Sequence, residues 1–291
     1  MTYAEFFVAN PISLPAIVFA LGLVVGSFLN VVIYRLPLMM EAEWTAQCRG
    51  LLEISDNNDS GEKPAFNLAI PNSHCPQCKH EISALENIPV VSWLVQKGKC
   101  RHCLAPISPR YPMIELATAI LSALVTFHFG FSLLTLAVLV LTWGLIALTM
   151  IDYDYQLLPD DITLPLLWLG LLINSSGLIV SLEDAVYGAI AGYLLLWGVY
   201  WLFKLLTGKE GMGYGDFKLL SALGAWLGWQ ALPMIILLSS LVGAVIGIGL
   251  IGILGRDRNI PIPFGPYLAS AGFLSLIWGN EITGFYSSLI M

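Results

Sequence analysis

The segment SLLTLAVLVLTWGLIALTMI, residues 132–151, contains no charged side chain, and Asp152 follows it directly. A helix needs about 20 apolar residues to cross the hydrocarbon core of a bilayer, and this segment meets that length. A carboxylate that continues from such a helix at membrane depth is energetically unfavourable and is by default a candidate functional group. The segment therefore predicts a membrane-spanning helix and marks Asp152 as a candidate site residue.

The composition of the whole chain extends this prediction. Of its 291 residues, 57% are hydrophobic and only 11% are charged, whereas soluble globular proteins carry roughly 25% charged residues. This composition excludes a soluble enzyme, a disordered protein and a fibrous protein. The other expected membrane helices are the apolar segments 12–33, 113–129, 163–180, 185–203, 217–230, 232–254 and 264–279. The sequence thus predicts an all-α polytopic membrane protein of about eight membrane helices, in which the short segment 217–230 is tilted, re-entrant or shielded by its neighbours.

The 13 lysines and arginines indicate how the chain is oriented in the membrane. If the N-terminus lies outside, eight spans place all 13 on one side, which the positive-inside rule identifies as the cytoplasm. The expected parts are a first membrane helix in residues 1–35, a cytoplasmic block in residues 36–112 and a bundle of about seven helices in residues 113–291. The net charge of −7 argues against a nucleic-acid partner, because phosphate backbones need a basic surface.

Four of the five cysteines form two C-x-x-C pairs in the cytoplasmic block, at Cys75, Cys78, Cys100 and Cys103. This spacing is close to that of zinc ribbons, in which four thiolates hold one tetrahedral ion. A cytoplasmic location disfavours disulfides, and a small polar block needs a metal to stabilise its fold. The sequence therefore predicts a structural Zn²⁺ site, with four unrelated buried thiols as the alternative. Cys48 is expected to take no part.

A second aspartate opens the sixth expected span, in the segment Gly213-Tyr-Gly215-Asp216-Phe-Lys218. The predicted topology brings Asp152 and Asp216 to the same cytoplasmic level of the membrane. Two close carboxylates cannot both ionise easily, so one keeps a proton and the pair can act as acid and base. This predicts the chemistry of an aspartic peptidase. The glycines permit close approach of an extended peptide, although a turn without function is the alternative.

The short loop after Asp152 carries three more aspartates. Asp154 and Asp160 are candidates for binding a basic substrate segment, with Asp161 and Glu210 contributing to the same negative field. The alternative is that Asp154 is simply solvated and that Asp160 or Asp161 caps the next helix, expected to begin near Ile162.

The chain resembles the type IV prepilin peptidases, the leader peptidase/N-methyltransferases. The resemblance rests on residues 26–37, both C-x-x-C pairs and residues 107–115, 151–160, 213–218 and 261–266. It implies that Asp152 and Asp216 are the catalytic pair. It also implies that the enzyme cuts the short basic leader of type IV prepilins and type II secretion pseudopilins after a glycine, at the cytoplasmic face of the bacterial inner membrane, with the N-terminus in the periplasm. The new N-terminal amine would then be methylated by S-adenosylmethionine.

The methyl donor should bind near the new amine, and its sulfonium, adenine and carboxylate favour aromatic, acidic and cationic neighbours. The cytoplasmic block supplies such residues where it rejoins the membrane: Trp93, Lys99, Arg110, Tyr111 and Glu115. Arg110 and Tyr111 are alternatively interfacial anchors of the second span.

Two other classes of function are compatible with parts of this pattern. A proton-coupled transporter also uses membrane carboxylates, but it predicts a polar partner near the midplane, and the only histidine in a span, His128, lies at the outer end. A zinc-stapled scaffold without catalysis would not need two aspartates at one depth.

Overall fold

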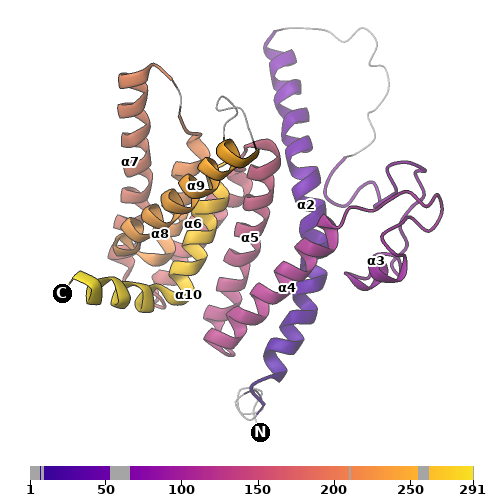
Figure 1. Ribbon diagram of the computed structural model, residues 1–291, viewed down its shortest axis with the longest axis horizontal. Helices are drawn as coiled ribbons and strands as arrows, with labels where there is room; N and C mark the ends of the chain where they lie inside the picture. The colour runs from indigo at the N-terminus through magenta and orange to yellow at the C-terminus, as the bar shows by residue number, and fades with distance from the viewer. Residues whose placement is uncertain (1–6, 8–9, 53–65, 210, 255–261, 291) are drawn as a thin grey trace. The chain divides into compact units, whose positions relative to one another are not determined.

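The computed structural model describes residues 7, 10–52, 66–209, 211–254 and 262–290. Within these residues there is no β-strand, only two isolated bridges. The helices are α2 (Ser13–Leu51), α3 (Val91–Val95), α4 (Arg110–Phe129), α5 (Leu133–Tyr155), α6 (Asp160–Asn174), α7 (Leu182–Thr207), α8 (Tyr214–Leu227), the 3₁₀ turn η1 (Trp229–Ala231), α9 (Leu232–Leu254) and α10 (Gly265–Ile290) (Figure 1). The all-α prediction is confirmed. Lys63, Glu210, Arg256, Arg258 and Pro261 lie outside the described residues.

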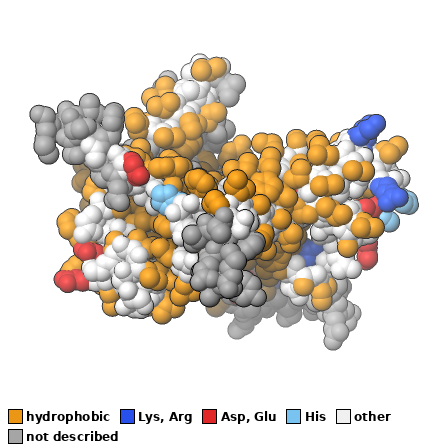
Figure 2. All heavy atoms as spheres, turned by 90° about the horizontal axis from the view of Figure 1, so that it is seen from below, with side chains coloured by type: hydrophobic (Ala, Val, Ile, Leu, Met, Phe, Trp, Pro, Cys, Tyr) orange, Lys and Arg blue, Asp and Glu red, His pale blue; other side chains and the backbone are white. Residues whose placement is uncertain are grey.

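Five of these helices have the length and apolar composition needed to cross a membrane: α2, α4, α5, α7 and the stretch Trp229–Leu250, which includes most of α9. Hydrophobic side chains are spread over the visible surface in Figure 2, as expected for helices that face lipid. The chain is therefore a polytopic membrane protein. Helices α6 and α8 are shorter, with 15 and 14 residues, and α10 is kinked at Trp278, close to the predicted end of the last span.

The chain divides into two compact units, Met1–Phe127 and His128–Met291. In the first unit, α4 packs directly against α2. A methyl group on Gly22 would lie 2.7 Å from the Cα atom of Ala119, and one on Gly26 would lie 2.6 Å from the Cα atom of Glu115. The two helices therefore approach each other through small residues, as is common for helices packed within membranes.

Helix α2 is longer than the predicted span 12–33, because it continues to Leu51 as an exposed arm. The residues after Pro37 are mostly strong helix formers, which propensity favours in the absence of any breaker. Just before this arm, Arg35 is buried, and its guanidinium donates to the carbonyl oxygens of Asn67 at 2.9 Å and of Pro71 at 2.6 Å. Arg35 thus ties α2 to the loop that precedes the cysteine pairs.

Helix α8 lies among α6, α7 and α10 in the second unit (Figure 1). Eleven of its 14 residues are buried. The backbones of Gly188 in α7 and Gly224 in α8 are in contact, so that a methyl group on either would overlap the other helix. A helix of this length spans about 21 Å, less than the hydrocarbon core. Neighbouring helices therefore shield this segment, as one of the three expectations for it requires.

Helix α6 differs from its predicted boundaries at both ends. It begins at Asp160 with Pro159 as the N-cap residue, so Asp160 and Asp161 lie in its first turn and the expectation that one of them caps the helix is wrong. Their charges still complement the positive end of the helix dipole. The helix ends at Asn174 rather than near residue 180, because the Asn174 amide donates to the carbonyl oxygens of Ala225 and Trp226 and a turn follows.

Candidate active site and metal centre

Asp152 lies in the last turn of α5. The helix ends there because Gln156 adopts a left-handed conformation, with a φ of 54°, and donates its N–H to the Asp152 carbonyl oxygen. The Asp152 side chain is buried, and its Oδ2 accepts a hydrogen bond of 2.9 Å from the backbone N–H of Gly265. Gly265 is the first residue of α10. The carboxylate thus faces the N-terminal end of another helix, where backbone donors lack partners within the helix.

Asp216 is the third residue of α8, and Gly213 is the N-cap residue of that helix. Its side chain is buried, and Oδ1 has no hydrogen-bond partner among the described residues. An unpaired buried carboxyl oxygen is rare in proteins and calls for a functional explanation. The short helix α8 therefore presents one aspartate, with an unsatisfied carboxyl oxygen, in its first turn.

Leu158 connects the two aspartate-bearing segments. A methyl group on Gly215, next to Asp216, would lie 2.7 Å from the Leu158 Cβ atom. A methyl group on Gly265 would lie 2.7 Å from the Asp152 Oδ2 atom and 3.1 Å from the Leu158 Cδ2 atom. Asp152 and Asp216 are also close enough to interact electrostatically. The structure therefore brings the predicted aspartate pair together, with close packing that leaves no room for side chains at either glycine.

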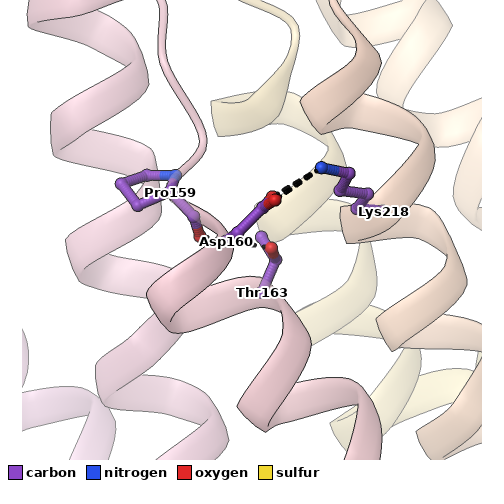
Figure 3. A network of polar contacts seen from close by, with 4 residues as sticks. All are labelled: Pro159, Asp160, Thr163 and Lys218. Carbon is purple, nitrogen blue, oxygen red and sulfur yellow. Dashed lines mark hydrogen bonds and ion pairs between the residues drawn. The ribbon is translucent and has the colours of Figure 1, made fainter. Parts of the chain in front are cut away.

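An ion pair joins α6 and α8 next to the two aspartates (Figure 3). The Lys218 Nζ atom lies 2.7 Å from both carboxylate oxygens of Asp160. In the following turn, the Thr163 hydroxyl donates to the Pro159 carbonyl oxygen at 3.1 Å. The charge of Asp160 is thus compensated within the chain. Both Asp154 and Asp160 are exposed. Asp160 and Lys218 are not predictable as partners, because 58 residues separate them and no local pattern links them.

The four predicted cysteine ligands lie together in the first unit. The sulfur atoms of Cys75, Cys78, Cys100 and Cys103 are all within 4.8 Å of one another, which fits a single tetrahedral ion. Cys48 is exposed on α2 and is not one of the four.

Each C-x-x-C pair forms the same backbone turn. Cys75 donates its N–H to the His80 carbonyl oxygen at 2.9 Å, and Cys100 donates to that of Ala105 at 2.8 Å. The residues that follow the second cysteine of each pair, Lys79 and Leu104, have φ values of 60° and 59°. This short structural repeat was not visible in the side-chain pattern, because only the cysteines are shared. The C-x-x-C spacing was its one available signal.

The backbone prepares this cluster for a cation. The N–H groups of Cys78 and Gln77 donate toward the Cys75 sulfur and lower the pKa of that thiol to about 6. The Ala105 backbone acts in the same direction on Cys103, but burial and the three neighbouring sulfurs outweigh it and raise the pKa of Cys103 to about 11. Four thiolates this close together repel one another, and a metal ion between them would supply the compensating positive charge.

The residues proposed for the methyl donor lie in the first unit. Glu115 is buried and accepts a hydrogen bond of 2.7 Å from the Val90 N–H. The Trp93 indole donates to the Ile107 carbonyl oxygen at 3.1 Å, and Lys99 pairs with Pro106 in an isolated bridge. Arg110 and Tyr111 begin α4. Val90, whose φ is 61°, was not predicted as a partner, since a backbone donor has no sequence signature.

Comparison with known proteins gives matches over both units. Residues 20–129 match the bacterial peptidase A24 N-terminal domain, and residues 139–248 match the type IV leader peptidase family. Three similar proteins are named prepilin leader peptidase/N-methyltransferase. That of Stutzerimonas stutzeri is 58% identical over 286 residues, 98% of each chain. That of Aeromonas hydrophila is 60% identical over 93% of each chain, and that of Pseudomonas aeruginosa is 54% identical over 98% of each chain. No solved structure matches the chain significantly.

Proposed function

Because the chain belongs to the type IV leader peptidase family, we propose that it cleaves the short basic leader from prepilins and type II secretion pseudopilins after a glycine. The chain is an enzyme with peptidase and N-methyltransferase activities, as its relatives' shared name states. Its membrane helices and its family fit a multi-pass protein of the inner membrane. The proposed orientation places the N-terminus in the periplasm and the active site on the cytoplasmic side, where the positive-inside rule puts the basic residues.

The observation that carries the peptidase proposal is the pair of buried aspartates. Asp152 and Asp216 come from different helices, interact electrostatically, and leave one carboxyl oxygen without a partner among the described residues. In the proposed reaction, one aspartate takes a proton from water as the water attacks the scissile carbonyl, and the other donates a proton to the carbonyl oxygen. Gly213 leaves space for the extended substrate backbone, whereas the space beside Gly215 is filled by Leu158. Asp154 adds negative charge for the basic leader, whereas Asp160 would act mainly through its ion pair with Lys218.

The two cofactors have different proposed roles. The geometry of the four sulfurs fits Zn²⁺ bound by Cys75, Cys78, Cys100 and Cys103, where it would stabilise the loop that carries them. S-adenosylmethionine would supply the methyl group. Its proposed binding residues are Lys99, Arg110, Tyr111 and Glu115, with Glu115 holding the substrate ammonium before it loses its proton.

The direct test is cleavage of a prepilin-like substrate by purified protein in detergent. Asp152→Asn and Asp216→Asn should each abolish cleavage, because neither half of the pair can supply both proton transfers. Glu183→Gln is the matched control, since it removes an exposed carboxylate from the same unit without touching the pair. Full cleavage by either active-site variant would refute the assignment. Proton transport without peptidase activity would favour the transporter instead.

A further inference from the structure

We propose that Gly265 determines which aspartate of the pair acts as the base and which acts as the acid. Its backbone N–H holds Asp152 as the carboxylate that activates water, and the proton of the resting pair lies on Asp216. This inference rests on the proposed peptidase function and deepens it, because the pair alone does not say which aspartate is base and which is acid. Gly265 is then a positioning residue, contributed by a third helix.

The surroundings of Asp152 favour its charged form. Its Oδ2 accepts the Gly265 N–H at 2.9 Å. Within the first turn of α10, Pro266 has no N–H, while Tyr267 and Leu268 donate to the Phe264 carbonyl oxygen. Gly265 therefore donates to Asp152 an N–H that has no acceptor within this turn. Hydrogen bonds of this kind are stronger to an ionised acceptor, and the positive end of the helix dipole acts in the same direction.

The surroundings of Asp216 favour its neutral form. Its side chain is 7% exposed, and Oδ1 meets no donor in the described part of the chain. Asp216 also lies in the first turn of a helix, and the Gly213 backbone hydrogen-bonds its side chain on the Oδ2 side, but no described donor reaches Oδ1. Negative charge on a buried oxygen that accepts no hydrogen bond is strongly disfavoured. When two neighbouring carboxyl groups share one proton, it stays on the oxygen that has nothing else to stabilise a negative charge.

This assignment gives a balanced reaction. The water oxygen bonds to the carbonyl carbon while one water proton moves to Asp152 and the Asp216 proton moves to the carbonyl oxygen, which forms a neutral gem-diol. The C–N bond then breaks, its electron pair stays on nitrogen, and nitrogen takes the proton from Asp152. One gem-diol hydroxyl returns a proton to Asp216 as the carbonyl reforms. The products are a carboxylic acid and an amine, and the pair returns to its starting state.

Infrared spectroscopy of the full-length protein in detergent tests where the proton lies. Isotopic labelling of the aspartate carboxyl carbons separates any protonated aspartate C=O band from the bands of the glutamates. We expect one labelled band at neutral pH, lost in Asp216→Asn and retained in Asp152→Asn. The reverse pattern, a band lost or retained in both variants, or no labelled band at all would overturn the assignment. Loss of cleavage in both variants supports the peptidase function, and the infrared bands test only which aspartate carries the proton.

The role of Gly265 has its own test. Gly265→Ala places a methyl group against the Asp152 Oδ2 atom and Leu158, so it should move the carboxylate away from the attacking water. Misplacing a catalytic group by about 1 Å costs about 10²-fold in rate, and we expect kcat to fall by that factor with KM unchanged. Gly198→Ala is the matched control, because an added methyl there meets no described atom within 4 Å. An unchanged kcat in Gly265→Ala, or an equal loss in both variants, would overturn the role of Gly265.

Discussion

At the scale of single residues, Asp160 is a candidate for substrate binding in the sequence, but in the fold its charge is paired with Lys218. Asp160 was expected to attract a basic leader, and its two oxygens instead receive the Lys218 ammonium at 2.7 Å. The pair also holds the N-terminal end of α6 against α8, next to the aspartate pair. Its contribution is modest, because both side chains remain partly exposed, at 30% and 51%.

A double-mutant cycle can measure that contribution. We expect Asp160→Asn and Lys218→Gln to destabilise the protein, and the double variant to show a coupling energy of about 0.2–1 kcal/mol. The short contacts of the Lys218 ammonium with both carboxylate oxygens place the value toward the upper end of that range. Thermal unfolding in detergent provides the measurement at low and high salt. Strictly additive effects would show that the two side chains are neighbours without a stabilising interaction.

The thiols of the metal centre give a prediction about pH. A zinc ion must displace the proton of Cys103, whose pKa of about 11 keeps it a thiol at neutral pH, but it finds Cys75 already ionised above pH 6. Zinc therefore displaces no proton from Cys75 above about pH 6, and it must displace one as the pH falls below that value. Competition with a chelator from pH 5 to 8 should give an affinity that rises with pH throughout and rises more steeply below pH 6. A constant slope would contradict this.

At the scale of elements, apolar runs predicted where helices lie better than where they end. The interiors of α5 and α7 were predicted because about 20 apolar residues have few alternatives in a membrane. Helix α2 extends past its apolar run because its next residues favour helix in water as well. Helix α6 stops early because the Asn174 amide contacts Ala225 and Trp226, more than 50 residues away. Contacts of this kind have no local signal.

The same limit applies to the candidate site. The aspartate pair could be predicted, because hydropathy fixes the depth of each residue and both carboxylates fall at one level. The cysteine cluster could be predicted from its spacing. Gly265 could not, because its contribution is a backbone N–H that acts on a residue 113 positions away. The close contacts of Leu158 with Gly215 and Gly265 were hidden for the same reason.

Helix α8 offers a test at this scale. Because the backbones of Gly188 and Gly224 touch, Gly224→Ala must push α7 away from α8. Overpacking of this kind typically costs about 1–3 kcal/mol, so the melting temperature should fall and cleavage should fall with it as α8 shifts. Gly198→Ala, on α7 but facing open space in the described structure, should leave both unchanged. A Gly224→Ala protein as stable as the control would mean that α7 and α8 are less tightly packed than the structure shows.

At the scale of the whole molecule, the two units separate the groups proposed for the two activities. The aspartate pair and Gly265 belong to the unit His128–Met291, while the cysteine cluster and Glu115 belong to Met1–Phe127. The family matches follow a similar division, with residues 20–129 in one match and residues 139–248 in the other. This division suggests that changes in the first unit can impair methylation without removing the cleavage machinery.

The final prediction follows from that division. Lys99→Gln, Arg110→Gln and Glu115→Gln each remove one charge proposed to hold the methyl donor or the substrate amine, and none lies in the unit that carries the aspartate pair. We expect at least one of them to cleave at the wild-type rate and to release a product with an unmethylated N-terminus. Glu115→Gln is the sharpest of the three, because it keeps an acceptor for the Val90 N–H and changes mainly the charge. Mass spectrometry of the cleaved substrate reads both reactions in one sample.

If all three variants methylate as the wild type does, the donor binds elsewhere, and the Gly26–Arg35 end of α2 becomes the next segment to test. If cleavage and methylation always fall together, the two units do not divide the activities, and the proposal for the first unit is wrong.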